Sequence, residues 1–178
     1  DVADFRGWKY FGGTSGATGK LGGTASALYP VLSLRAASTN DLTKRTKIIP
    51  TSISVTVAVV STGATSLQIA LLMLPTPNTG ATFATTPAGS LTTIDTIATA
   101  ATAVTGTAIW NATIPNVVGT YTFDLKTMND NANVMGYNAA GTVAITGPSV
   151  LTLAAGPLTG TATVGATIAA AINWKEIG

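Results

Sequence analysis

The stretch TKRTKIIPTSISVTVAVVSTGATSLQIALLMLPTPNTG, from Thr43 to Gly80, decides the fold. In its "SISVTVAVV" segment every second side chain is a branched apolar one, and small or polar residues stand between them. This period of two is typical of a β-strand that turns one face toward a core. The apolar face of this predicted strand carries Ile53, Val55, Val57 and Val59.

A second strand follows after the short turn "STGATS". In "LQIALLMLP" both faces are largely apolar, with Leu67, Ile69, Leu71 and Met73 on one and Ala70, Leu72 and Leu74 on the other. A strand with two apolar faces is covered on both sides. Pro75 and Pro77 end it, because proline has no N–H for a strand ladder.

The same alternation, broken by Gly, Pro, Asn and Ser clusters, runs through the rest of the chain. Further strands are predicted at residues 25–36, 108–114, 120–126, 141–146, 150–155 and 166–177. The Ala-rich segment 95–106 favours a turn or two of helix instead. About eight evenly spaced strands predict an all-β fold, a single jelly-roll β-sandwich with an N-terminal extended arm. The predicted core is Ile53, Val55, Val57, Leu67, Ile69, Leu71, Phe123 and Trp174.

The composition is unusually poor in charge. Only 9% of the 178 residues are charged, while 46% are hydrophobic, and Thr is abundant. Globular proteins carry roughly 25% charged residues, and a soluble monomer needs a charged surface. We therefore expect much of the surface to be buried against copies of the same chain. No apolar run is long enough for a membrane span. The chain starts without Met or a signal-peptide pattern, which fits a processed or a trimmed chain.

Residues 1–23 form a different kind of segment, here called the arm. It combines the aromatic-rich "FRGWKYF" with a Gly-rich linker, and the sandwich domain is predicted to span residues 24–178. An aromatic segment on a linker is expected to bind outside its own core. The predicted subunit-interface residues of the arm are Phe5, Trp8, Tyr10 and Phe11.

Basic residues gather in the first part of the chain. The first 47 residues hold seven basic and three acidic side chains, a net charge of +4, and the remainder has a net charge of −2. Such an excess attracts phosphate backbones, but it is also typical of a solvated turn. The sequence leaves open whether nucleic acid or a neighbouring subunit contacts Arg6, Lys9, Lys44, Arg45 and Lys47.

The side chains that most enzymes use are missing. The chain has no Cys and no His, so thiolate metal sites and histidine bases are excluded. The Gly-rich linker resembles a phosphate-binding loop from Gly13 to Lys20, but Leu21 stands where a Ser or Thr is required. The carboxylates are scattered. We therefore predict no enzyme activity, no cofactor and no metal site.

Two smaller motifs each allow both a functional and a plain structural interpretation. The loop from Asn129 to Asn133 offers oxygen ligands for a cation, yet Asn and Asp are equally common in plain turns. Asn111 begins an Asn-Ala-Thr sequon, which matters only in a glycosylating pathway. The sequence does not decide whether either site is used.

The opening stretch resembles the early strand pair of single jelly-roll coat proteins of small viruses. The resemblance rests on the basic Lys44, Arg45 and Lys47, on the Ser-Ile-x-Val-x-Val pattern of Ser52, Ile53, Val55 and Val57, and on residues 67–80. The closing "INWKEIG" is similar to the last strand of many virion proteins. This resemblance implies a capsid protein. The Arg-rich arm with which that family binds its genome is not matched here.

These observations predict a structural protein of a virion shell, as a major, minor or decoration capsid protein. Its expected partners are many copies of itself and other virion proteins. The alternative is an extracellular filament or pilus subunit, in which a terminal segment completes a neighbour's sheet. A carbohydrate-binding or hydrolytic sandwich is a third class, and it lacks a pair of carboxylates in one cleft.

Overall fold

The computed structural model describes residues 2–6, 10–11, 21, 23–36, 47–74, 82–83, 92–95, 102–125, 135–136 and 150–177. Every regular element in these ranges is a strand. They are β1 (Val2–Arg6), β2 (Tyr10–Phe11), β3 (Tyr29–Ala36), β4 (Lys47–Val59), β5 (Thr62–Leu74), β6 (Thr92–Asp95), β7 (Thr107–Pro115), β8 (Gly119–Asp124), β9 (Met135–Gly136), β10 (Val150–Val164) and β11 (Thr167–Ile177).

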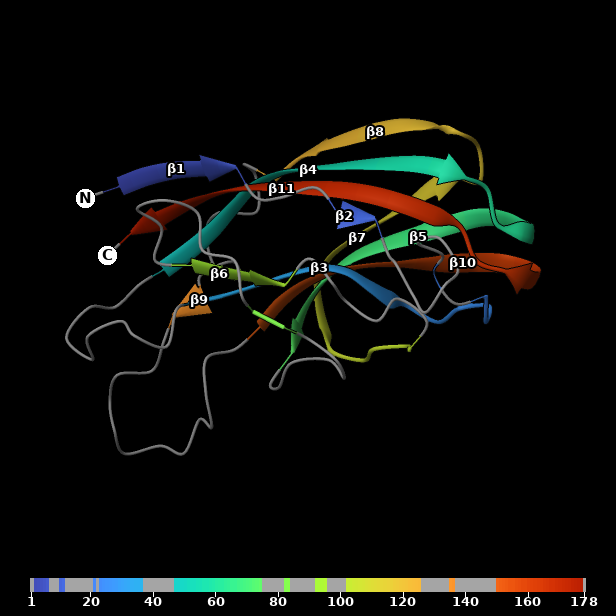
Figure 1. Ribbon diagram of the computed structural model, residues 1–178, viewed down its shortest axis with the longest axis horizontal. Helices are drawn as coiled ribbons and strands as arrows, with labels where there is room; N and C mark the ends of the chain where they lie inside the picture. Colours follow the sequence, from blue (N-terminus) through green and yellow to red (C-terminus); the bar gives the residue numbers. More distant parts are fainter. Residues whose placement is uncertain are drawn as a thin grey trace.

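The strands form two antiparallel sheets that lie one above the other (Figure 1). The first sheet has the order β1-β11-β4-β8, with β2 also paired to β11 and β9 to β4. The second has the order β6-β3-β10-β5-β7. The predicted all-β class is therefore confirmed.

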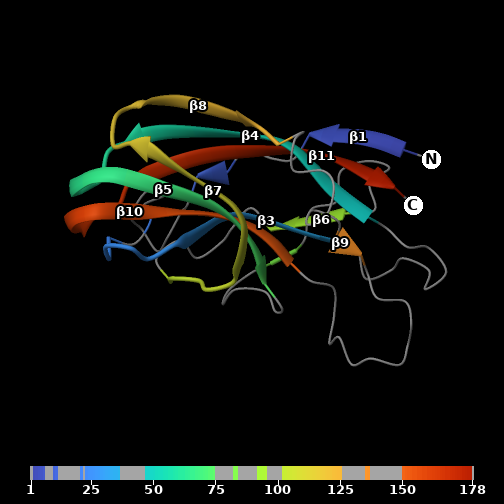
Figure 2. The ribbon, with the colours of Figure 1, turned by 180° about the vertical axis from the view of Figure 1, so that it is seen from behind.

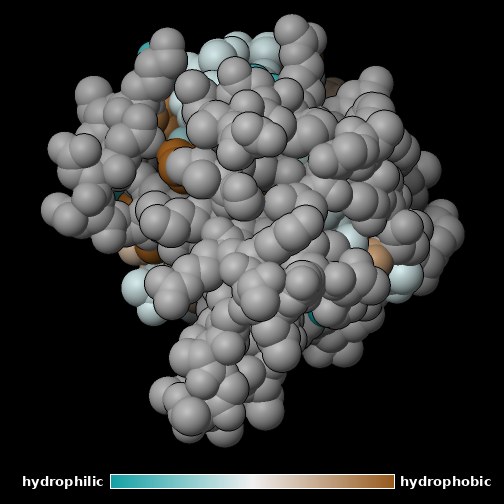
Figure 3. All heavy atoms as spheres, turned by 90° about the vertical axis from the view of Figure 1, so that its left-hand side faces the viewer, coloured by the Kyte–Doolittle hydropathy of each residue, from teal (hydrophilic) through white to brown (hydrophobic). Residues whose placement is uncertain are grey.

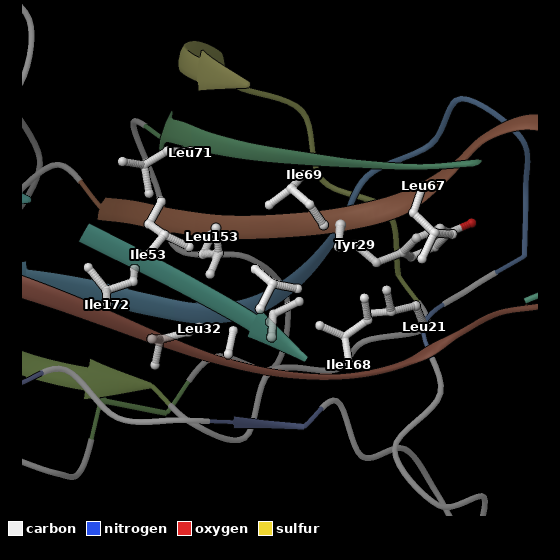
Figure 4. Packing of buried hydrophobic residues seen from close by; sticks show 14 of the residues in the cluster. Leu21, Tyr29, Leu32, Ile53, Leu67, Ile69, Leu71, Leu153, Ile168 and Ile172 are labelled. Atoms are coloured by element: carbon white, nitrogen blue, oxygen red, sulfur yellow. The ribbon is translucent and has the colours of Figure 1, made fainter. Parts of the chain in front are cut away.

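The opening stretch forms β4 and β5, which lie in different sheets and face each other across the core. Alternate residues of both strands belong to one buried cluster, together with β3, β10 and β11 (Figure 4). Of the eight predicted core residues, seven are at most 1% exposed, and Phe123 is half-buried against the same cluster. Val59 departs from the predicted face, because the pairing of β4 with β11 shifts register between Val57 and Val59, and the Val59 side chain is exposed.

The second sheet is covered on its outer face as well. Ala70, Leu72 and Leu74 of β5 are buried in a second cluster with Val150 and Ala154 of β10. Leu28, Phe83 and Val104 pack against this cluster from outside the sheet. The prediction that β5 is covered on both sides is confirmed.

Several predicted boundaries need correction. β4 begins at Lys47, five residues before the predicted segment, and includes Pro50. This proline is tolerated because the pairing with β11 shifts register between Asn173 and Trp174, beside Pro50, and a bulge needs no regular ladder. β6 was not predicted. The predicted strand at 141–146 lies outside the described residues.

The predicted helix at 95–106 is wrong where the structure describes that segment. Asp95 ends the strand β6, and Val104 forms an isolated bridge with Leu28. The Thr-rich sequence has a poor helix propensity. Its described residues therefore form extended pairings, in β6 and in the Val104–Leu28 bridge. No helix occurs in the described ranges.

The long strands pair in a nested order. β5 pairs with β7, β4 with β8, β3 with β10 and β1 with β11, so each pair encloses the previous one along the chain. The two remaining pairings, β11 with β4 and β10 with β5, join these pairs into the two sheets (Figure 2). The C-terminal strands β10 and β11 therefore lie inside the two sheets, beside β5 and β4 from earlier in the chain.

Candidate functional site

Two segments of the arm form strands that pair with β11 in the first sheet of the same chain. β1 pairs with the end of β11, with Phe5 opposite Trp174 and Arg6 opposite Asn173. β2 pairs with the start of β11, with Tyr10 opposite Ala170 and Phe11 opposite Ala169. The arm thus covers the edge of β11 that β4 leaves open. Trp8 and Lys9 lie outside the described residues.

The arm is also fixed at its last residues. Leu21, which the sequence placed in the linker, is buried in the core cluster, and its N–H donates to the carbonyl of Ala166 at 2.9 Å. An apolar side chain in a Gly-rich segment is the sequence feature that could have indicated this burial. Residues 12–20 lie outside the described residues. In the described part of the chain, β1 and β2 join the sandwich through their pairing with β11.

The predicted basic residues do not gather into one described patch. Lys47 pairs with Ile177 and Gly136, while Lys44 and Arg45 lie outside the described residues. In the described ranges, basic and acidic residues are equal in number. They are Arg6, Arg35, Lys47 and Lys175 against Asp4, Asp95, Asp124 and Glu176. This balance holds for the described ranges alone, and Lys9, Lys44 and Arg45 lie outside them.

A buried polar row crosses the outer face of the second sheet. Ser33 on β3 stands between Asp95 on β6 and Thr152 on β10, and all three are fully buried. The hydroxyls of Ser33 and Thr152 are 2.8 Å apart. Beside this row, the guanidinium carbon of Arg35 lies 4.1 Å from the ring centre of Phe83. The hydrogen bond between Ser33 and Thr152 and the cation–π contact of Arg35 belong to the packing of this face.

Three turns, each joining a strand of one sheet to a strand of the other, meet at one end of the molecule: β4–β5, β7–β8 and β10–β11. The side chain of Asn116 in the β7–β8 turn donates to the carbonyls of Ser61 and Ala64 at 2.7 and 2.9 Å, and accepts from the N–H of Ser61. The hydroxyl of Ser61 donates to the carbonyl of Val164 at 2.7 Å. One asparagine and one serine therefore tie all three turns together.

Sequence reasoning did not find this set of turns. The sequence feature that could have indicated these turns is the Val117-Val118 pair inside "PNVVGT". There, two apolar side chains lie in a segment with the turn residues Pro, Asn and Gly. The sequon residue Asn111 is exposed within β7, opposite Ala70, as the strand prediction required. The Asn129–Asn133 loop lies outside the described residues.

The described ranges offer neither a metal cluster nor a membrane helix. They contain no group of three or more His, Cys, Asp or Glu side chains that could hold a metal ion. Nor do they contain a helix with the length and apolarity that crossing a bilayer requires. Comparisons with protein-family models, curated proteins and solved structures find no match to this chain.

Proposed function

We propose that this protein is a structural subunit that assembles with many copies of itself into a virion shell. The observation that carries this proposal is the nested pairing of its eight long strands. Two further features support it: the low charge of the chain and the separate strand that the arm adds to a sheet edge. The proposed partners are copies of the same chain and other virion proteins, the proposed location is the virion, and no enzyme activity is assigned.

The nested pairing is the order expected of a jelly roll. A jelly roll has eight strands in two sheets, with the connections of two Greek keys. If the chain is pictured as one long hairpin of four pairs, rolling it up brings its last strands beside its middle ones. The pairings of β11 with β4 and of β10 with β5 have this form. Viral capsid proteins, lectins and cupins use this fold.

The surface favours the capsid function among these classes. The described residues hold no cluster of metal-ligating side chains of the kind that a metal-dependent cupin needs. The low charge of the whole chain fits a subunit whose exterior is buried by neighbours, because the cores of protein interfaces are depleted of charged residues.

The strand β1 supplies a means of linking copies. Among the described strands it pairs with β11 alone, and it lies at the edge of the first sheet beside the C-terminal end (Figure 1). Asp4 stands opposite Lys175 in this pairing. Exchange of β1 between copies would keep every one of these pairings, because the same edge of β11 accepts either copy's strand.

The same observation supports the alternative function. A subunit of an extracellular filament or pilus would donate β1 to the β11 edge of the next subunit, which is donor-strand complementation. Donation in one direction produces a fibre, whereas contacts that close on themselves produce a shell. The two functions therefore differ in the geometry of the assembly.

Electron microscopy of the purified protein tests the proposal directly. Closed shells would support the virion function, fibres would support the filament function, and single subunits at high concentration would contradict both.

A cysteine pair tests strand exchange separately. The chain has no natural Cys, so Ala3→Cys with Glu176→Cys creates one pair of directly opposed residues on β1 and β11. After oxidation of the assembled protein, exchange gives covalent dimers and larger multimers on a non-reducing gel, and β1 held within one chain gives only monomers. The control is Thr56→Cys with Thr120→Cys. Those hydroxyls lie 2.9 Å apart on β4 and β8, so their disulfide stays within one chain.

A further inference from the structure

Among the residues whose side-chain exposure the structure describes, the exposed large hydrophobic ones lie at one end of the molecule. They are Val59, Val60, Val117, Val118 and Val164, here called the valine end. Val117 is 56% exposed and Val118 is 64% exposed. These residues belong to the three turns that Asn116 and Ser61 tie together. In Figure 1 this is the end where β4 finishes and β5 begins.

The strands and turns that form the valine end contain no charged residue. Residues 55–70, 108–123 and 155–172, which form the three turns with their flanking strands, contain no Lys, Arg, Asp or Glu. The registers place the described charged residues toward the other end. Lys47 lies at the start of β4, Lys175 at the end of β11 and Asp124 at the end of β8. Figure 3 views that other end, where the visible described atoms include hydrophilic and hydrophobic ones.

Hydrogen bonds and close backbone contacts hold the three turns together. Besides the hydrogen bonds of Asn116 and Ser61, the β5 and β10 backbones approach closely. Gly160 has a φ of 96°, and a Cβ there would overlap the carbonyl oxygen of Gly63. A surface that is already held in shape loses little entropy on binding, which favours association.

The chemistry of the valine end favours a protein partner over other surfaces. A nucleic acid requires basic residues, and an interfacial membrane site uses basic residues with aromatic or long aliphatic side chains. The valine end offers short aliphatic side chains among Thr, Ser, Gly and Ala. An uncharged apolar surface of this kind matches the core of a protein interface.

The size of the valine end indicates how it is used. Five partly exposed valines cover at most a few hundred Å², roughly the largest apolar patch of an ordinary monomer. A stable pair of proteins buries about 800 Å² per partner. The valine end is therefore too small to hold two copies together alone, and it suits an assembly in which other contacts, such as that of β1, hold the copies in place.

We propose that the valine end packs against the valine ends of other copies in the assembled particle. This inference rests on the proposed self-assembly and names a surface that carries it. The contact places uncharged aliphatic side chains against one another and removes them from water, while the charged ends of the subunits point away from it. An aspartate at this contact would be buried without a partner.

The test is the double variant Val117→Asp with Val118→Asp. Both side chains are more than half exposed in the single chain, so we expect circular dichroism and thermal unfolding to stay close to wild type. We expect the critical concentration for assembly, measured by sedimentation and electron microscopy, to rise at least about tenfold. Val117→Thr with Val118→Thr preserves shape without adding charge, and we expect a smaller rise. The matched control is Ala103→Asp with Thr105→Asp, two exposed positions outside the valine end, which we expect to assemble like wild type.

The outcomes separate this inference from the proposed function. Wild-type protein that never assembles contradicts both. If the wild type assembles and the V117D/V118D variant assembles equally well, the valine contact alone is contradicted. Binding of wild-type protein to phosphatidylcholine–phosphatidylserine vesicles, lost in the V117D/V118D variant while assembly persists, overturns the inference in favour of a lipid surface.

Discussion

Asn116 and Ser61 hold each other through hydrogen bonds in both directions. The N–H of Ser61 donates to Oδ1 of Asn116 at 2.9 Å, and Nδ2 of Asn116 donates to the carbonyl of Ser61 at 2.7 Å. The two residues are 55 positions apart in the chain and belong to turns that connect the two sheets. This pair therefore fixes how the β4–β5 and β7–β8 turns sit together.

Replacing Asn116 by Ala should destabilise the fold. The substitution removes the partners of one N–H and two carbonyls in a half-buried setting, so we expect a loss of about 1–3 kcal/mol in the free energy of unfolding. Urea unfolding followed by circular dichroism measures this loss. The matched control is Asn111→Ala on the exposed face of β7, which should change stability by less than about 0.5 kcal/mol. Equal effects at the two positions would contradict the role of Asn116.

The hydroxyls of Ser33 and Thr152 should show strong coupling in a double-mutant cycle. Ser33→Ala alone leaves the fully buried hydroxyl of Thr152 without this partner, with an expected cost of about 1–3 kcal/mol. Adding Thr152→Val removes the second hydroxyl, so the double variant should recover much of that loss. Chemical denaturation of the four proteins gives the coupling energy. Strictly additive losses would show that the two hydroxyls do not depend on each other.

Two glycines should respond very differently to alanine. A Cβ at Gly156 would overlap the backbone oxygen of Ala27, so Gly156→Ala must push two backbone segments apart, with an expected loss of about 1–3 kcal/mol. At Gly119 the nearest atom to an added Cβ is the hydroxyl of Tyr121 at 3.6 Å, an ordinary contact. We expect Gly119→Ala to stay within about 0.5 kcal/mol of wild type. Thermal unfolding of both variants checks the contrast, which fails if Gly156→Ala is tolerated equally well.

The ring contact between Trp110 and Phe123 should stabilise the two sheets at the edges formed by β7 and β8. Trp110 is on the edge strand β7, Phe123 is on the edge strand β8, and their rings meet edge to face with centres 4.9 Å apart. Such pairs contribute about 0.5–1.5 kcal/mol beyond the area they bury. A double-mutant cycle with Trp110→Leu and Phe123→Leu should give a coupling energy in that range. A coupling energy near zero would mean that the rings act only as separate apolar groups.

The strand content was largely predictable from alternation. Ile53, Val55 and Val57 are all fully buried, as their period of two required, and Ile168, Ala170, Ile172 and Trp174 in β11 follow the same rule. The prediction failed where the strand pairing shifts register. Val59 and Val164 are both exposed, and each follows a register shift, between Val57 and Val59 in the β4–β11 pairing and between Gly160 and Val164 in the β10–β5 pairing. Periodicity tells which side chains share a face only as far as no bulge interrupts the strand.

The candidate surfaces were less predictable. The aromatic arm was visible in the sequence, but the β11 edge with which its strands pair was not, because any open edge accepts a strand through backbone hydrogen bonds. The valine end combines residues from three turns that are far apart in the chain. Only Val117 and Val118 stood out locally, as apolar residues between a Pro-Asn pair and a Gly.

The amino-acid sequence by itself determined that the chain forms strands, which of their faces are apolar, and that Cys and His chemistry is excluded. These properties follow from local periodicity and residue type. The tertiary structure alone decided which strands pair, that β1 lies beside β11, and that five valines share one end. The physical reason is that strand pairing uses backbone groups common to every residue, so register and partner are set by how all the apolar faces can be buried at once.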